Sequence, residues 1–263
     1  MSDFERKIAL VSGRKVSYIE VGFGPALFLM HGIGGNAKSW RAQLENLSSD
    51  YHMIAWDAPG YGASDVRDGT LLEYVEAAIG LLDVLGIDRA FVLGHSMGGV
   101  IAQGLAGSVP SRVKKLILSS TFMGHGAAEG SPLQDGYLAR LHDIETMNPE
   151  AFGMARASSM LSESASVELC KEVAGIASQV REDGLRAGCQ LLNYADTSRM
   201  IVGLEMPVLL IMGKEDVIVK PEKTMQIADV LGDVKHVHLP NTAHAAYLED
   251  PTNYNAILRE FLS

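Results

Sequence analysis

A glycine-rich junction joins a short apolar run to a helix near the middle of the chain. Residues 90–94 predict a buried strand, and the segment through 101–109 predicts a helix. The residues between them read His-Ser-Met-Gly-Gly-Val. Glycines at such a junction let a strand and a helix approach closely, and they leave Ser96 on a sharply turned backbone. The junction predicts a serine hydroxyl held at the edge of a sheet.

Short apolar runs alternate with helical segments, such as 71–86, through the first half of the chain and again near its end. This alternation predicts an α/β fold with a mostly parallel sheet of eight strands and helices on both faces. We expect the first two strands to be antiparallel, because a tight turn at Ser12 and Gly13 joins them. The expected strands are 7–11, 16–20, 26–30, 51–56, 90–94, 114–120, 207–213 and 233–240.

A change of pattern divides the chain into three segments. From Phe122 to Arg199 the strand-like runs stop, and stretches such as 132–147 and 165–180 have helical spacing instead. We expect an α/β core at 1–121 and 200–263, interrupted by a helical cap at 122–199.

Composition excludes several classes of function. The chain has 263 residues and a formal net charge of -10, which disfavours binding to nucleic-acid phosphates. The first ten residues hold four charges and no apolar stretch, and no later run reaches the roughly 20 apolar residues that span a bilayer. We therefore expect a cytoplasmic protein with no membrane or nucleic-acid partner. The sequence makes no prediction of oligomeric state.

Neither a metal nor an organic cofactor is expected. Cys170 and Cys189 show no CxxC spacing, and the histidines show no HExxH pattern. The G-x-G-x-x-G fingerprint of dinucleotide-binding folds is also absent.

The segment from Gly94 to Gly98 matches the pattern G-x-S-x-G, directly after a predicted strand and before a predicted helix. In that context Ser96 is a candidate nucleophile, and the N–H groups at the start of the helix favour negative charge beside it. Taken alone, the same pattern fits an ordinary glycine-rich turn. Because an unassisted serine hydroxyl is a poor nucleophile, the hypothesis needs a base and a residue that orients the base.

Two residues after the later strands fit these roles. Asp216 follows the strand at 207–213, and His244 follows the next strand, so the chain order is Ser, Asp, His. We predict that His244 is the general base and that Asp216 orients it. Individually, Asp216 also fits a capping residue and His244 a solvated loop residue. Glu215 is the competing carboxylate.

The loop His-Gly-Ile-Gly-Gly-Asn at 31–36 follows another predicted strand. A tetrahedral intermediate needs hydrogen-bond donors for its oxyanion, and we assign the backbone N–H groups of Ile33 and Met97 to this oxyanion hole. A plain turn is the alternative. A phosphate-binding loop is disfavoured, because the G-K-[ST] signature is missing.

Five segments together resemble the α/β-hydrolase superfamily with a helical cap: FLMHGIGGNAKSW, AWDAPGYGASD, VLGHSMGG, LIMGKEDVIV and NTAHAAYLEDP. The end of the cap and the HAAYLEDP segment are similar to 3-oxoadipate enol-lactonase-like hydrolases. The resemblance implies a serine hydrolase that cleaves a small carboxylic ester or lactone through an acyl-enzyme.

Two other functions stay open within this superfamily. The C–C bond hydrolases that cleave ring-opened diketones share the Ser-Asp-His order, but they usually carry proline in the HG loop and tryptophan after the histidine, where this chain has Ile33 and Ala245. A ligand-binding sensor with weak hydrolase activity is the third possibility. Dehalogenases and epoxide hydrolases are disfavoured, because they use a carboxylate where this chain has Ser96.

Candidate pocket residues come from the cap and from the segment after the HG loop. The candidates for an apolar wall are Met123, Met147, Met154 and Met160, and Trp40 is a candidate to flank the pocket. All five also fit simple packing. Arg156 and Arg181 are candidates to pair with a substrate carboxylate, although a solvated surface arginine is the more common case.

Overall fold

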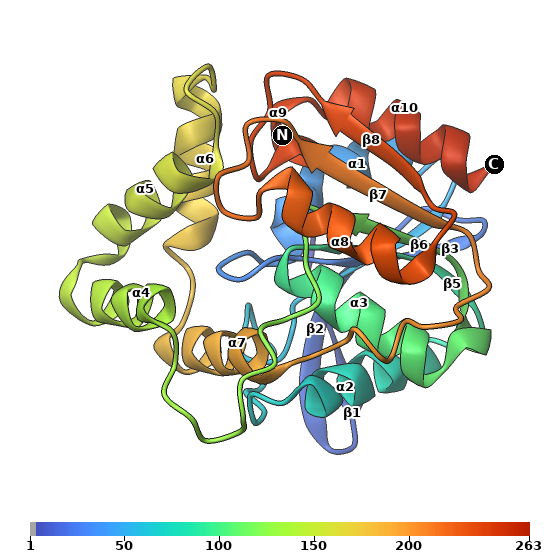
Figure 1. Cartoon of the computed structure of the whole chain (residues 1–263), viewed down its shortest axis with the longest axis horizontal. Helices are drawn as coiled ribbons and strands as arrows, with labels where there is room; N and C mark the ends of the chain where they lie inside the picture. Colours follow the sequence, from blue (N-terminus) through green and yellow to red (C-terminus); the bar gives the residue numbers. More distant parts are fainter. Residues whose placement is uncertain (1–3) are drawn as a thin grey trace.

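The predicted α/β fold is confirmed by a computed structural model, which describes residues 4–263. Its eight strands form one sheet in the order β1-β2-β4-β3-β5-β6-β7-β8 (Figure 1). The pairings of β2 with β1 and β4 are antiparallel, and all the others are parallel. The strands are β1 Lys7–Val11, β2 Arg14–Val21, β3 Ala26–Met30, β4 His52–Trp56, β5 Ala90–His95, β6 Val113–Ser119, β7 Val208–Gly213 and β8 Lys235–Leu239.

Helices cover both faces of this sheet. Along β3, Leu27 and Leu29 face one apolar cluster, whereas Phe28 and Met30 face the other, because successive side chains of a strand alternate between the two faces. The helices outside the segment between β6 and β7 are α1 Arg41–Leu47, α2 Leu71–Val84, α3 Met97–Ser108, α8 Pro221–Leu231, α9 Ala246–Glu249 and α10 Pro251–Leu262, with short 3-10 helices η1 Ala37–Trp40 and η2 Pro110–Arg112.

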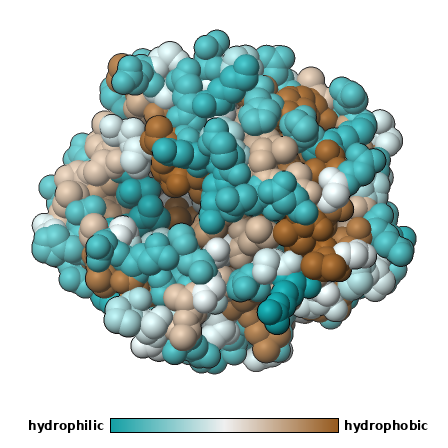
Figure 2. All heavy atoms as spheres, viewed as in Figure 1, coloured by the Kyte–Doolittle hydropathy of each residue, from teal (hydrophilic) through white to brown (hydrophobic). Residues whose placement is uncertain are grey.

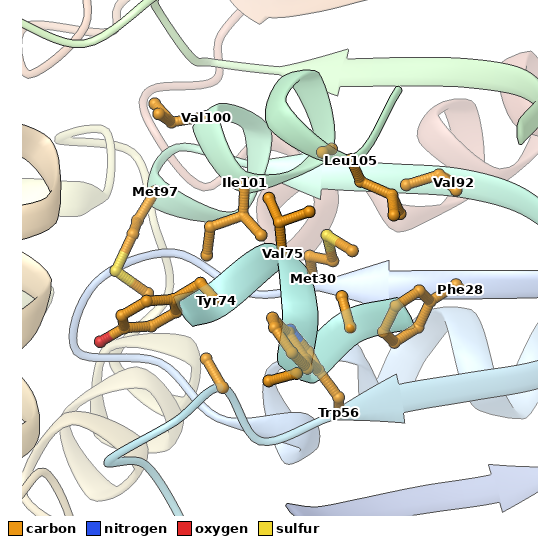
Figure 3. Close-up of a cluster of buried hydrophobic side chains, with 14 of the residues drawn as sticks. Phe28, Met30, Trp56, Tyr74, Val75, Val92, Met97, Val100, Ile101 and Leu105 are labelled. Carbon is orange, nitrogen blue, oxygen red and sulfur yellow. The ribbon is translucent and has the colours of Figure 1, made fainter. Parts of the chain in front are cut away.

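The cluster under α2 and α3 fixes the position of the glycine-rich junction. Figure 3 shows one cluster that contains Tyr74 of α2, Ile101 of α3 and side chains of the sheet such as Phe28 and Val92. All four residues are fully buried. Burial of this much apolar surface is the main force that holds the start of α3 against the end of β5.

Four helices lie between β6 and β7, where the sequence predicts the cap. Figure 1 shows them together at one side of the sheet, in yellow-green to orange. Asn148 and Ser166 each accept a hydrogen bond from a backbone N–H of the helix that follows them, which explains why two of these helices begin where they do. The boundaries at 122 and 199 stay a prediction. The helices are α4 Asp135–Thr146, α5 Pro149–Met160, α6 Val167–Ala177 and α7 Glu182–Tyr194.

Two groups of polar contacts tie these helices to the rest of the chain. Arg41 of α1 forms an ion pair with Glu172 of α6, with an N–O distance of 2.7 Å. The guanidinium of Arg181 donates to the carbonyl oxygens of Gly62 and Ser64, at 2.7 and 2.9 Å. Arg181 therefore joins the start of α7 to a core loop and is not among the residues that line the cavity described below.

The surface is mixed in character. Figure 2 shows hydrophilic side chains interspersed with smaller apolar groups over the face that it presents. Across residues 4–263, no helix has both the length and the apolar character needed to cross a membrane.

Candidate active site

Ser96 lies at a strained turn between β5 and α3. Its φ of 51° and ψ of -115° fall outside the regions that side chains favour. Four hydrogen bonds hold this backbone. Its N–H donates to the carbonyl of Ser119 at 2.9 Å, and its own carbonyl accepts from Thr121 Oγ1 at 2.6 Å and from the N–H groups of Gly99 and Val100 at 2.9 and 3.3 Å. These hydrogen bonds hold the backbone of Ser96 in its strained conformation, as expected where the placement of a side chain serves a function.

The glycines of the junction are required by close packing. A Cβ atom added at Gly94 would overlap the backbone of Gly98, and one added at Gly98 would overlap the carbonyl oxygen of Met30. Backbone atoms of packed strands cannot shift far enough to make room. Only glycine fits at these two positions.

Asp216 and His244 are joined by a buried hydrogen bond. The distance from His244 Nδ1 to Asp216 Oδ2 is 2.8 Å, and the side chains are 5% and 0% exposed. The other carboxylate oxygen, Oδ1, accepts the N–H groups of Ile218 and Val219, both at 2.9 Å. Glu215 is exposed and lies outside this arrangement.

These contacts determine the charge on Asp216 and the tautomer of His244. Burial by itself would raise the pKa of the Asp216 carboxyl, but the charge and hydrogen bond of His244 and the two backbone N–H groups outweigh it and hold the pKa below its ordinary value. An ionised carboxylate only accepts hydrogen bonds, so the proton of neutral His244 resides on Nδ1. Its Nε2 is then free to accept a proton.

The glycine-rich loop after β3 runs against Ser96. A Cβ atom added at Gly32 would lie 3.1 Å from Ser96 Cβ, so the loop backbone is in direct contact with the nucleophile candidate. The loop is held by His31, whose Nε2 accepts the N–H of Ala58 at 3.0 Å and whose Nδ1 donates to the Gly32 carbonyl at 2.8 Å. Ile33, the next residue, lines the same cavity as Ser96.

Met97 is the first residue of α3, so its N–H has no acceptor one turn earlier in the helix. Its side chain is buried in the core beside Tyr74 (Figure 3). The two N–H groups that the sequence assigns to an oxyanion hole thus lie on the two segments that border Ser96.

One cavity, of about 480 Å³, brings these residues together. Ser96, His244 and Ile33 line it from the core, and Arg156 lines it from α5. A volume of this size accommodates a small organic molecule. Met160, a candidate for the apolar wall, also lines the cavity. Further lining residues that sequence reasoning missed are His95, Phe122, His125, Gln134, Tyr137, Arg140, Leu192, Lys220 and Lys223.

Trp40 and Met123, two of the candidates for the pocket, lie elsewhere. Trp40 is fully buried on η1, where its ring packs 4.6 Å from that of Tyr247, and it does not line the cavity. Met123 is half-buried against the core, its carbonyl accepts the N–H of Thr197 at 2.9 Å, and it also lies outside the cavity lining. For Trp40 the reason is that nearness to a loop in sequence does not determine on which side of a sheet a side chain packs.

His95 is buried directly before Ser96, at a position of the G-x-S-x-G pattern where any residue is allowed. Its Nε2 donates to the carbonyl oxygen of His244 at 2.9 Å, and the two rings lie 4.7 Å apart. Burial, and then the nearby His244, lowers the pKa of His95 to about 3, so that its ring is neutral at physiological pH. No sequence pattern shows this contact, since 149 positions separate the two residues.

Comparison with known proteins identifies the family of the chain. The family described as having the α/β-hydrolase fold matches residues 25–159. An (E)-2-((N-methylformamido)methylene)succinate hydrolase of Acinetobacter baylyi is 30% identical over 98% of this chain and 97% of its own length. A pimeloyl-[acyl-carrier protein] methyl ester esterase of Vibrio parahaemolyticus is 27% identical over 91% of this chain and 95% of its own.

Among solved structures, the enol-lactonase of Burkholderia xenovorans superposes with a TM-score of 0.85, with 22% identity over 97% of this chain and 99% of that one. This similarity concerns the fold alone. The profile match and the full-length relatives carry the assignment, and the chain belongs to the α/β-hydrolase family.

Proposed function

We propose that this protein hydrolyses a small carboxylic ester or lactone through an acyl-enzyme formed on Ser96. The observation that carries the proposal is the buried 2.8 Å hydrogen bond between Asp216 and His244, because His244 lines the same cavity as Ser96, which lies on a strained turn. A serine, an imidazole that takes its proton and a carboxylate that orients the imidazole form the constellation that activates a hydroxyl for acyl transfer.

The reaction proceeds in two half-reactions. Ser96 Oγ attacks the carbonyl carbon while His244 Nε2 takes the hydroxyl proton, and the N–H groups of Ile33 and Met97 stabilise the oxyanion. The C–O bond to the leaving group breaks as His244 returns the proton to the leaving oxygen. Water then attacks the acyl-enzyme with His244 again as base, which releases the carboxylic acid and regenerates Ser96. Asp216 stabilises the transient imidazolium throughout.

Two further points support an ester or a lactone as the substrate. The Vibrio relative is named for a methyl ester, and both full-length relatives are named as hydrolytic enzymes. The loop at Ile33 and the residue Ala245 differ from the pattern of C–C bond hydrolases, which keeps that function as the second candidate.

The experiment is a substrate panel of short p-nitrophenyl esters, enol-lactones and ring-cleavage diketones, assayed with wild type and Ser96→Ala. We expect ester or lactone turnover that Ser96→Ala abolishes, with unchanged thermal unfolding. Ser108→Ala, an exposed serine at the end of the same helix, is the matched control. Undiminished ester turnover in Ser96→Ala contradicts the proposal, and turnover of diketones alone replaces it with the second candidate.

A further inference from the structure

Two arginines at the cavity lack an acidic partner. Arg140 of α4 and Arg156 of α5 both line the cavity. Within the part of the chain that the structure describes, neither guanidinium forms an ion pair or a hydrogen bond, and Arg140 Nε is buried with no partner at all. Elsewhere the arrangement is different: Arg41, Arg186 and Arg259 each pair with a carboxylate within 3.0 Å.

Keeping such groups unpaired is unfavourable for folding. A buried cation loses hydration, and among residues 4–263 no hydrogen bond or ion pair of these two guanidinium groups compensates for that loss. Burial, and then repulsion from Arg140, lowers the pKa of Arg156 to about 10, so Arg156 still carries its charge at neutral pH. Like charges kept close together in a cavity mark a place where an anion binds.

Two further residues that line the cavity are also positively charged. Lys220 and Lys223, both exposed, border it from the region between β7 and α8, and no aspartate or glutamate of residues 4–263 is among its lining residues. This local excess of positive charge contrasts with the formal net charge of -10 for the whole chain. An anionic ligand is therefore repelled by the protein as a whole and attracted at this cavity.

The arginines and the catalytic candidates belong to different walls. Ser96 and His244 come from the core, whereas Arg140 and Arg156 come from two neighbouring helices of the inserted segment (Figure 1). Apolar side chains of Phe122, Tyr137 and Leu192 also line the space, and these suit a short hydrocarbon chain.

We propose that Arg140 and Arg156 together bind a carboxylate of the substrate, so that the substrate is a small ester or lactone carrying a free carboxylate at the end remote from the scissile carbonyl. This inference rests on the proposed function for the identity of the scissile group. The anion site itself rests only on the two unpaired guanidinium groups. Planar guanidinium groups suit carboxylates because they donate parallel hydrogen bonds.

The test compares two esters with the same leaving group and chain length, mono-p-nitrophenyl adipate and p-nitrophenyl hexanoate. Wild type should prefer the adipate ester by about 10- to 100-fold in kcat/KM, the range expected of charge-assisted hydrogen bonds. Arg140→Gln and Arg156→Gln should each lose most of that preference through a higher KM for the adipate ester. Arg199→Gln, an exposed arginine outside the cavity lining, should keep it.

Equal kcat/KM for the two esters in wild type, or full preference in both arginine variants, would overturn the inference. Failure of the proposed function has a different signature, which is ester turnover that survives Ser96→Ala. A binding measurement tests the anion site separately from hydrolysis. Adipate should raise the unfolding temperature of Ser96→Ala, but it should not raise that of the double variant Ser96→Ala, Arg156→Gln. An equal shift in both proteins also counts against the anion site.

Stability distinguishes ligand binding from a structural role. Because the Arg156 guanidinium forms no hydrogen bond or ion pair with any of residues 4–263, Arg156→Gln should unfold at the same temperature as wild type or at a higher one. A marked decrease in unfolding temperature would show that Arg156 supports the fold and would contradict its assignment to ligand binding.

Discussion

His95 Nε2 donates a hydrogen bond to the backbone carbonyl oxygen of His244, 2.9 Å away, from the position next to Ser96. The ring of His95 also lies 4.7 Å from that of His244 and 4.9 Å from that of Tyr247. The residue beside the candidate nucleophile therefore holds the loop that carries the candidate base. We infer that His95 is a positioning residue.

Replacing His95 by glutamine or methionine tests this role, because the two side chains are similar in size and only glutamine can donate to the carbonyl. His95→Met should lower kcat by about 10- to 100-fold with little change in KM, since the base is displaced while the substrate cavity persists. His95→Gln should keep most of the wild-type kcat, because glutamine can still donate to the carbonyl. Steady-state kinetics on a short p-nitrophenyl ester provides the measurement, and equal activity in the two variants would argue against the hydrogen bond.

Asp216→Asn should abolish most activity while the protein stays folded. The amide oxygen can still accept the N–H groups of Ile218 and Val219, but its NH₂ group faces His244 Nδ1 and favours the tautomer with the proton on Nε2. That tautomer cannot accept the Ser96 proton. We expect a decrease in kcat of about 10³- to 10⁴-fold. Glu215→Gln, at the exposed neighbour, should retain wild-type kcat; a matching loss there would implicate Glu215 instead.

Much of this site follows from the sequence, because parallel strands end at a common edge. Asp216 and His244 each follow a strand, and the rule that carboxyl ends meet at one edge brings them near Ser96 without further information. The glycine pattern around Ser96 adds the turn. These local signals are strong because they depend on strand order and backbone sterics.

The cavity wall does not follow from the sequence in the same way. Arg140 and Arg156 lie on amphipathic helices whose rotation depends on packing against other helices, so no periodicity distinguishes a cavity arginine from a surface arginine. Trp40 is the reverse case: in the sequence it is a candidate to flank the pocket because it follows the HG loop closely, but it packs behind this loop against Tyr247.

Lowering the pH should remove the contribution of the Asp216 carboxylate to the free energy of unfolding. The pKa of this carboxyl is lowered in the folded state, so its ionised form favours folding. That contribution is fully present above the unfolded-state pKa of about 3.9 and is lost as pH falls through the lower folded pKa. The difference in unfolding free energy between wild type and Asp216→Asn should therefore narrow between about pH 5 and pH 3. Urea titrations over this range measure it, with Glu215→Gln as the control for net charge. A difference that widens toward acid pH would contradict the sign of the shift.

Two glycine-to-alanine substitutions should change stability in opposite directions. A Cβ at Gly98 overlaps the carbonyl of Met30, which belongs to a central strand and cannot move, so Gly98→Ala should lower the free energy of unfolding by about 2–3 kcal/mol. Gly175 lies exposed in α6 with no atom within 4 Å of an added Cβ, and Gly175→Ala should raise the free energy of unfolding by about 0.5–1 kcal/mol, because alanine loses less backbone entropy in a helix. Urea midpoints of the two variants and wild type measure both effects. A Gly98→Ala protein as stable as wild type would mean that β3 and α3 are not in the close contact on which the turn at Ser96 depends.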